Sequence, residues 1–191
     1  MPVRIYLDHA ATTPVVPAAR AAMAEGLTRW ANPSSPHAEG RAARAAVEGA
    51  RRRIKAALGW PHQLIFTSGA TEAIAIGLGR TRAAAMLVSA VEHDAVLRAG
   101  GAAAIVPVDP QGRVALNAVP AGALVAVQAV NNETGVIQPL DRIAASVRGA
   151  GGVLFADCAQ SAGKLALPDA DLIAISAHKL GGPPGIGALL V

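Results

Sequence analysis

The sequence is poor in cysteine and in aromatic residues, since its 191 positions hold one Cys, two Trp, two Phe and one Tyr. A single cysteine excludes an internal disulfide framework and favours a reducing compartment. Scarce aromatic rings leave little for stacking on nucleic-acid bases. No apolar run is long enough to cross a bilayer, and no apolar stretch typical of a secretory signal follows the first residues. We therefore expect a cytoplasmic protein that binds neither a membrane nor nucleic acid.

Short apolar runs alternate with longer amphipathic ones. The short runs predict strands at residues 5–7, 64–67, 86–89, 104–108, 124–128, 153–156, 172–175 and 186–191. The amphipathic runs predict helices at residues 17–29, 36–58, 70–80, 94–99 and 140–150. Ser35 followed by Pro36 predicts the start of the second helix, because a hydroxyl caps a helix well and proline suits its first position. This alternation predicts an α/β fold with a mostly parallel sheet and helices on both faces.

Charge is also sparse, with 16% charged residues and a formal net charge of +4. The strongest basic cluster lies in the predicted helix at 36–58, where Arg44, Arg52 and Lys55 share one stripe. A nucleic-acid site is one interpretation of such a cluster. A solvated helix face is the other, and Glu48 favours it because it lies four residues from both Arg44 and Arg52, the spacing of ion pairs along a helix.

In open α/β sheets, ligands bind beyond the carboxyl ends of the strands. The predicted strand at 64–67 is followed by Ser68-Gly69-Ala70-Thr71, which leads into a helix. Small residues leave room for a ligand, and exposed N–H groups at a helix N-terminus attract a phosphate. The same residues could form an ordinary capped turn, so a phosphate site is one of two interpretations.

Single polar residues follow four other predicted strands: His93, Asn132, Asp157 and Lys179. An acid at the end of an apolar strand needs a partner for its charge, and a lysine just past a buried strand can be desolvated and become nucleophilic. Each residue also has a structural alternative, such as an asparagine turn or a solvent-facing lysine. Together they place an acid, an imidazole, a carboxamide and a lysine beside a phosphate cradle. These groups can hold pyridoxal phosphate, whose ring accepts electrons from a substrate carbon.

The same residues resemble those of the cysteine desulfurases, which are class-V members of the fold-type-I pyridoxal-phosphate enzymes. The motifs are YLDHAATTP at 6–14, NPSSPH at 32–37, FTSGATE at 66–72, EH at 92–93, NNETG at 131–135, DCAQS at 157–161 and SAHKLGGPPGIG at 176–187. The order of the motifs matches the family from the first predicted strand to the last residue. The resemblance therefore implies the large domain of a fold-type-I transferase, with a division into an amino-terminal arm at 1–15 and a pyridoxal-phosphate-binding domain at 16–191.

The resemblance also implies a role for each matching residue. Lys179 would be the Schiff-base lysine and carry the substrate Cα proton, and His93 would stack on the cofactor ring as an acid–base group. Asp157 would pair with the ring nitrogen and Gln160 with the phenolic oxygen. The implied phosphate contacts are Ala70, Thr71, Ser176 and His178, and the implied substrate contacts are Ala11, Thr12 and Asn132, the last also beside the cofactor. No metal is implied.

The family converts L-cysteine to L-alanine and passes a persulfide sulfur to acceptor or scaffold proteins, and its members are homodimers. They are longer than this sequence and continue into a smaller carboxy-terminal domain that is absent here, and which holds the nucleophilic cysteine. Cys158 is expected to be a small buried residue instead. The resemblance thus implies a desulfurase lineage whose 191-residue chain is inactive alone. Another class-V enzyme, such as an aminotransferase or a selenocysteine lyase, remains open, as does a non-catalytic cofactor-binding module.

Overall fold

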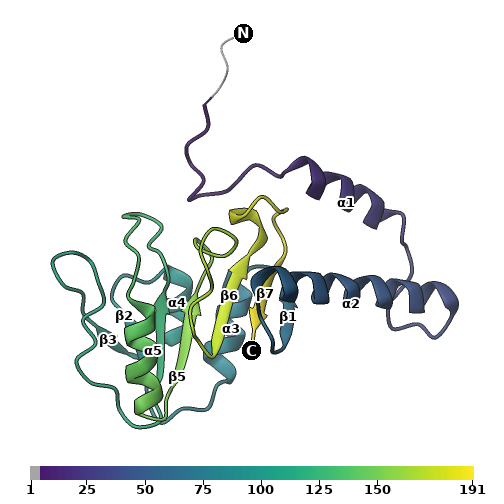
Figure 1. The fold of residues 1–191 in the computed structure, drawn as a ribbon. Helices are drawn as coiled ribbons and strands as arrows, with labels where there is room; N and C mark the ends of the chain where they lie inside the picture. The colour runs from purple at the N-terminus through teal and green to yellow at the C-terminus, as the bar shows by residue number, and fades with distance from the viewer. Residues whose placement is uncertain (1–4) are drawn as a thin grey trace.

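The computed structural model describes residues 5–191, which are built around one seven-stranded sheet (Figure 1). The strands are β1 (Leu64–Thr67), β2 (Met86–Ser89), β3 (Ala104–Val106), β4 (Leu124–Gln128), β5 (Val153–Asp157), β6 (Leu172–Ser176) and β7 (Gly187–Leu190). The helices are α1 (Pro17–Leu27), α2 (Ala38–Leu58), α3 (Ala70–Arg80), α4 (Asp94–Gly100) and α5 (Leu140–Gly149). A single 3-10 turn, Ala177–Lys179, follows β6.

The strand order is β1-β7-β6-β5-β4-β2-β3, and only β7 runs against its neighbours. The pairs β2–β3, β2–β4, β4–β5 and β5–β6 are all parallel. Every residue of β4 and β6 is buried, as expected for strands that have helices on both faces. The prediction of a mostly parallel sheet is therefore confirmed.

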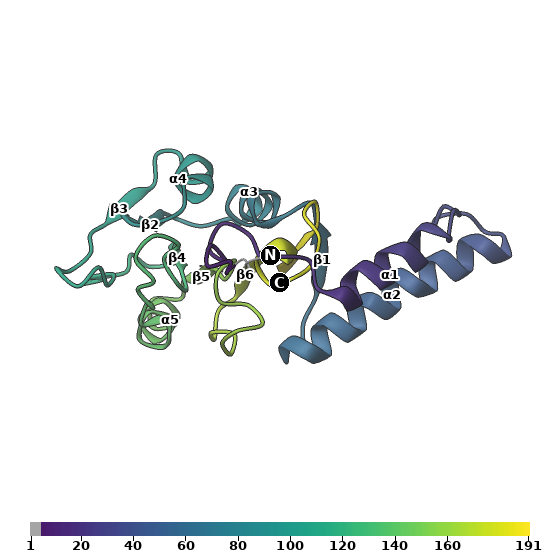
Figure 2. The same ribbon diagram turned by 90° about the horizontal axis from the view of Figure 1, so that it is seen from above.

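Two apolar cores cover the two faces of the sheet. On one face α3 and α4 pack around Phe155 and Ile74, and on the other α5 packs around Leu154 and Ile143. Figure 2 shows α3 and α4 on one side of the strands and α5 on the opposite side. The predicted three-layer arrangement is confirmed. Among residues 5–191, no helix has both the length and the apolar character that a bilayer span requires.

The α1–α2 hairpin projects away from the sheet (Figure 1). Helix α1 buries none of its residues, and α2 reaches the core only through Ile54 and Leu58 near its end. Arg51 fastens α2 to the edge strand, because its guanidinium donates to the Leu64 carbonyl and lies 4.9 Å over the Phe66 ring. Most of the basic stripe of α2 stays exposed, in line with the interpretation as a solvated helix face.

Two sequence expectations fail at the amino-terminal end. The strand predicted at 5–7 does not form, because this segment finds no partner strand and turns back on itself, with the Tyr6 hydroxyl bonded to the carbonyls of Asp8 and Thr12. Helix α2 begins at Ala38, two residues later than predicted. Its cap is not Ser35 but His37, whose Nδ1 accepts a hydrogen bond from the Gly40 N–H at 3.2 Å.

One strand of the sheet is also shorter than predicted. Strand β3 ends two residues early, because Pro107 has no N–H for the ladder.

Gly187, the first residue of β7, allows a close approach that shapes the edge of the sheet. A Cβ there would lie 2.5 Å from the Ile175 carbonyl oxygen and 2.7 Å from the Gly69 carbonyl carbon. Both neighbours are backbone atoms, which cannot rotate away. We expect Gly187→Ala to lower the free energy of unfolding by about 1–3 kcal/mol, the usual effect of overpacking, as measured by urea denaturation.

Gly79→Ala is the matched control, since a Cβ at Gly79 would meet nothing within 4 Å in the exposed last turn of α3. That variant should be neutral or gain up to about 1 kcal/mol from the higher helix propensity of alanine. Equal stability of the two variants would show that the close approach at Gly187 does not constrain the fold.

Candidate active site

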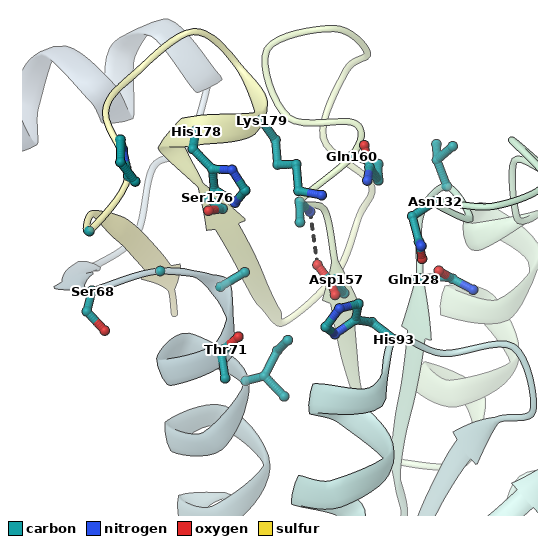
Figure 3. A pocket seen from close by; sticks show the side chains of 17 residues that line it. Ser68, Thr71, His93, Gln128, Asn132, Asp157, Gln160, Ser176, His178 and Lys179 are labelled. Atoms are coloured by element: carbon teal, nitrogen blue, oxygen red, sulfur yellow. Dashed lines mark hydrogen bonds between the residues drawn. The ribbon is translucent and has the colours of Figure 1, made fainter. Parts of the chain in front are cut away.

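A cavity of about 400 Å³ opens at the carboxyl ends of the strands (Figure 3). Its lining is Ser68, Gly69, Ala70, Thr71, Ile74, His93, Gln128, Val130, Asn132, Asp157, Ala159, Gln160, Ser176, His178, Lys179, Pro184 and Gly185. All nine residues predicted to contact a cofactor lie in this lining. The two other predicted substrate residues, Ala11 and Thr12, do not line it. Thr12 lies at the rim, where its hydroxyl is 3.2 Å from Nδ1 of His178.

The turn between β1 and α3 forms one wall of the cavity. The N-cap residue of α3 is Gly69, which has no side chain that could bond to the first N–H groups of the helix. The helix itself offers these groups no acceptor either. The Glu72 carboxylate instead accepts a hydrogen bond from the Ser68 N–H, which lowers the pKa of Glu72. Because Gly69, Ala70 and Thr71 line the cavity, the first N–H groups of α3 and the positive end of its dipole lie at the cavity and suit an anion.

Asp157 ends β5 at the floor of the cavity. Burial raises the pKa of its carboxyl group, while a hydrogen bond from the Ala159 N–H at 2.9 Å and electrostatic interactions with His93 and Lys179 lower it (Figure 3). A buried carboxylate is stable only with such compensation. The arrangement therefore favours a further cation, such as a protonated ring nitrogen, close to Asp157.

Lys179 lies in the 3-10 turn that follows β6 and directs its side chain into the cavity (Figure 3). Burial is the main cause of its lowered pKa, with Asp157 acting in the opposite direction. Its ammonium group donates to the carbonyl of Ala10, which also accepts a hydrogen bond from Nε2 of Gln160 at 2.8 Å. A lysine with a lowered pKa is more often unprotonated, which an attack on an aldehyde requires.

His93 caps α4 and faces the cavity at the same time. Its Nδ1 accepts a hydrogen bond from the Ala95 N–H at 3.1 Å. The neutral ring therefore carries its proton on Nε2, because a nitrogen that accepts a hydrogen bond cannot hold the proton. The capping contact thus fixes His93 as a hydrogen-bond donor toward the cavity.

The two consecutive asparagines have separate tasks. Asn131 holds the turn, since its Oδ1 accepts hydrogen bonds from the N–H groups of Glu133 and Thr134 and its Nδ2 donates to Val91. Asn132 lies in the lining of the cavity and contacts Glu133 through its Nδ2 at 2.7 Å. The turn that the sequence suggested and the pocket position that the resemblance implied both exist, on adjacent residues.

Sequence reasoning missed Gln128, which lines the cavity, and the buried Glu92, which supports it from behind. Oε1 of the buried Glu92 accepts hydrogen bonds from the Ser89 hydroxyl and from the Gln128 N–H, the latter at 2.7 Å, and Gln128 donates from its side chain to Val91. Oε2 of Glu92 is buried without a partner. Burial is the main cause that raises the pKa of Glu92 to about 8. Its place directly before His93 was the available signal.

Glu92 makes stability depend on pH. The folded protein keeps a proton on Glu92 that the unfolded chain releases above its ordinary pKa of 4.5. The free energy of unfolding should therefore fall as the pH rises from about 4.5 to about 8, at about 1.4 kcal/mol for each unit of pKa difference. Glu92→Gln keeps the acceptor atom and cannot ionise, so its stability should exceed that of the wild type by several kcal/mol at pH 8 and match it near pH 4.5. Denaturation at a series of pH values measures both curves.

Asp157 is present in both proteins, so only the part of its titration that depends on the charge of Glu92 differs between them. Parallel stability curves for the wild type and Glu92→Gln would show that Glu92 is already ionised in the folded protein at neutral pH.

The matches to known proteins agree with this geometry. The chain matches the aminotransferase class-V family over residues 5–191. It is 40% identical to a cysteine desulfurase of Frankia sp. (strain EuIK1), in a match that covers 97% of this chain and 52% of that relative. It is 36% identical to the cysteine desulfurase IscS of Shewanella pealeana, in a match that covers 100% of this chain and 54% of that relative. The chain spans about half the length of the curated relatives it matches. The alignment with the Frankia relative covers 218 positions, more than the 191 residues here, so that relative has extra residues within the matched region.

Solved structures show the same likeness. An X-ray structure of a NifS-like protein from Rickettsia africae ESF-5 superimposes with a TM-score of 0.89 at 29% identity, covering 97% of this chain and 57% of that one. A structure described as SspA in complex with cysteine superimposes with a TM-score of 0.88 at 30% identity. This match covers 97% of this chain and 60% of that one. The fold and the position of the cavity define an α/β protein of the fold-type-I transferase class. Within that class, the chain belongs to the aminotransferase class-V family, whose members depend on pyridoxal phosphate.

Proposed function

We propose that this chain is the cofactor-binding part of a cysteine desulfurase and that it holds pyridoxal phosphate through Lys179. The observation that supports this most directly is the buried acid Asp157, which shares one cavity with Lys179 and with the uncapped N-terminus of α3. These residues suit the three polar parts of the cofactor, namely its ring nitrogen, its aldehyde and its phosphate.

Each lining residue has a part in this proposal. The Ala70 and Thr71 end of α3 binds the phosphate together with Ser176 and His178. Asp157 keeps the ring nitrogen protonated, and Gln160 donates to the phenolic oxygen. Asn132 and the Nε2–H of His93 face the ring and the substrate. When bound, the cofactor supplies an electron sink for a carbanion at the substrate Cα, and Lys179 carries the proton that leaves that carbon.

The proposed substrate is L-cysteine. The names of the curated relatives and the cysteine bound to the SspA structure support this substrate over those of aminotransferases or selenocysteine lyases. We further propose a cytoplasmic homodimer that hands sulfur to an acceptor protein. The dimer is supported by α1, which buries no residue and leaves Leu27 and the neighbouring Trp30 more than four-fifths exposed.

Reductive trapping tests the cofactor site. Pyridoxal phosphate followed by borohydride and peptide mapping should label Lys179, because the sequence has only three lysines and Lys179 is the one that lines the cavity. Lys179→Arg should abolish the label. Lys164→Arg is the matched control, since Lys164 acts electrostatically on Lys179 but is absent from the cavity lining. A label at Lys55 or Lys164 instead would overturn the assignment.

Cys158 sets the expected activity of this chain. It is the one cysteine in the sequence, it is fully buried, and burial raises its pKa to about 12. A thiol in that state supplies almost no thiolate to attack a substrate sulfur. The purified chain with pyridoxal phosphate and L-cysteine should therefore release no sulfide above the level of the free cofactor, and iodoacetamide should modify Cys158 only on unfolding. Rapid cysteine-dependent sulfide release would contradict this expectation.

A further inference from the structure

The amino-terminal arm, residues 5–15, lies beside the cavity and accepts hydrogen bonds from two side chains of its lining, Lys179 and Gln160. The carbonyl oxygen of Ala10 accepts hydrogen bonds from both the Lys179 ammonium and Nε2 of Gln160. These are the residues that the proposed function assigns to the aldehyde and to the phenolic oxygen of the cofactor. A backbone atom from the other end of the chain thus holds both side chains where the cofactor would meet them.

Tyr6 closes the turn that carries this carbonyl. Its hydroxyl lies 2.8 Å from the Asp8 carbonyl oxygen and 2.9 Å from that of Thr12, so one O–H group joins the two ends of residues 8–12. The Ala11 N–H adds contacts of 3.3 Å to the backbone and side-chain oxygens of Asp8. The Tyr6 ring also meets the His9 ring edge-on at 5.1 Å. Ala10 lies between these contacts, so the position of its carbonyl depends on the closed turn.

The same arm is tied to the loop that bears Lys179. The Thr13 N–H donates to the His178 carbonyl at 2.7 Å, and the Thr13 hydroxyl donates to the Lys179 carbonyl at 3.0 Å. Further along, the Val16 N–H donates to the Gly181 carbonyl at 3.0 Å. Gly181 has a φ of +88°, and a Cβ there would lie 2.8 Å from a Val16 methyl group, so the crossing depends on glycine.

We propose that Tyr6 is a positioning residue and that residues 8–12 form a strap. The strap holds the Lys179 and Gln160 side chains until pyridoxal phosphate replaces the Ala10 carbonyl as their partner. The proposal rests on the proposed function. Lys179 first loses a proton to solvent, and its amine then condenses with the cofactor aldehyde and expels water. The nitrogen no longer has the ammonium hydrogens that contact Ala10. The strap contact to Lys179 must therefore open for the cofactor to attach, and the strap slows attachment by holding the charged form of the amine.

Tyr6→Phe removes the hydroxyl and keeps the ring contact with His9. In the cofactor-free chain, a short pulse of acetic anhydride followed by peptide mapping should modify Lys179 about five-fold faster in Tyr6→Phe than in the wild type, the change expected for one hydrogen bond of ordinary strength. The rate at Lys55 should stay the same and serves as the internal reference. Amide hydrogen exchange at Ala11 and Thr13 should accelerate in parallel.

Thr28→Val is the matched control, because it removes a hydroxyl that donates to the Glu25 carbonyl at 2.7 Å next to the end of α1, away from the cavity lining. It should change neither the Lys179 rate nor the exchange of the arm. Equal Lys179 rates in Tyr6→Phe and the wild type would overturn the strap.

Stopped-flow mixing with pyridoxal phosphate then separates the two proposals. Attachment at Lys179 should be faster in Tyr6→Phe if both hold. If the cofactor attaches to Lys179 equally fast in the two proteins, the strap fails and the proposed function stands. If the cofactor attaches to Lys179 in neither protein, the proposed function fails, and the acetylation rates alone decide whether the arm restrains Lys179.

Discussion

One buried carboxyl group, at the end of β5, organises the site. Asp157 is almost fully enclosed, and burial works against its ionised form. Three groups favour the ionised form, namely the Ala159 N–H two residues further on, and His93 and Lys179 from two other segments of the chain. Glu92, the other buried acid nearby, has a raised pKa and keeps its proton at neutral pH. Of the two acids only Asp157 lines the cavity, where a ligand with a cationic ring nitrogen would compensate the burial of its carboxylate.

Neighbouring polar residues divide structural and binding tasks between them. Asn131 builds its turn and Asn132 enters the cavity; Glu72 binds the backbone of Ser68 and leaves the end of α3 free for an anion. His93 does both at once, since its capping nitrogen fixes which nitrogen carries the proton. Because short polar side chains readily bond to nearby backbone groups, the binding residues need such partners to hold the local turns in place.

Much of this arrangement could be predicted from the sequence, because it depends on local patterns. Apolar runs located β1 to β7 within one or two residues, and the rule that ligands lie beyond strand ends gathered Asp157, Lys179 and their neighbours. The rest depends on contacts between distant segments. Residues 5–7 have the composition of a strand but no partner strand, and the Ala10 carbonyl meets Lys179 across 169 positions. Glu92 was missed because its burial is a property of the packed sheet rather than of its neighbours in sequence.

The place of β7 in the sheet has a consequence for biosynthesis. The strand lies between β1 and β6, yet it follows both of them in the sequence, and the N–H and C=O groups of Val191 pair with Gln63. A chain emerging from the ribosome can assemble β2 to β6 in order, but β1 pairs with β7 and so joins the sheet when residues 187–190 appear. The arm can contact Gln160 and residues 178–181 before that point, but the edge of the sheet that carries α2 is completed after its centre.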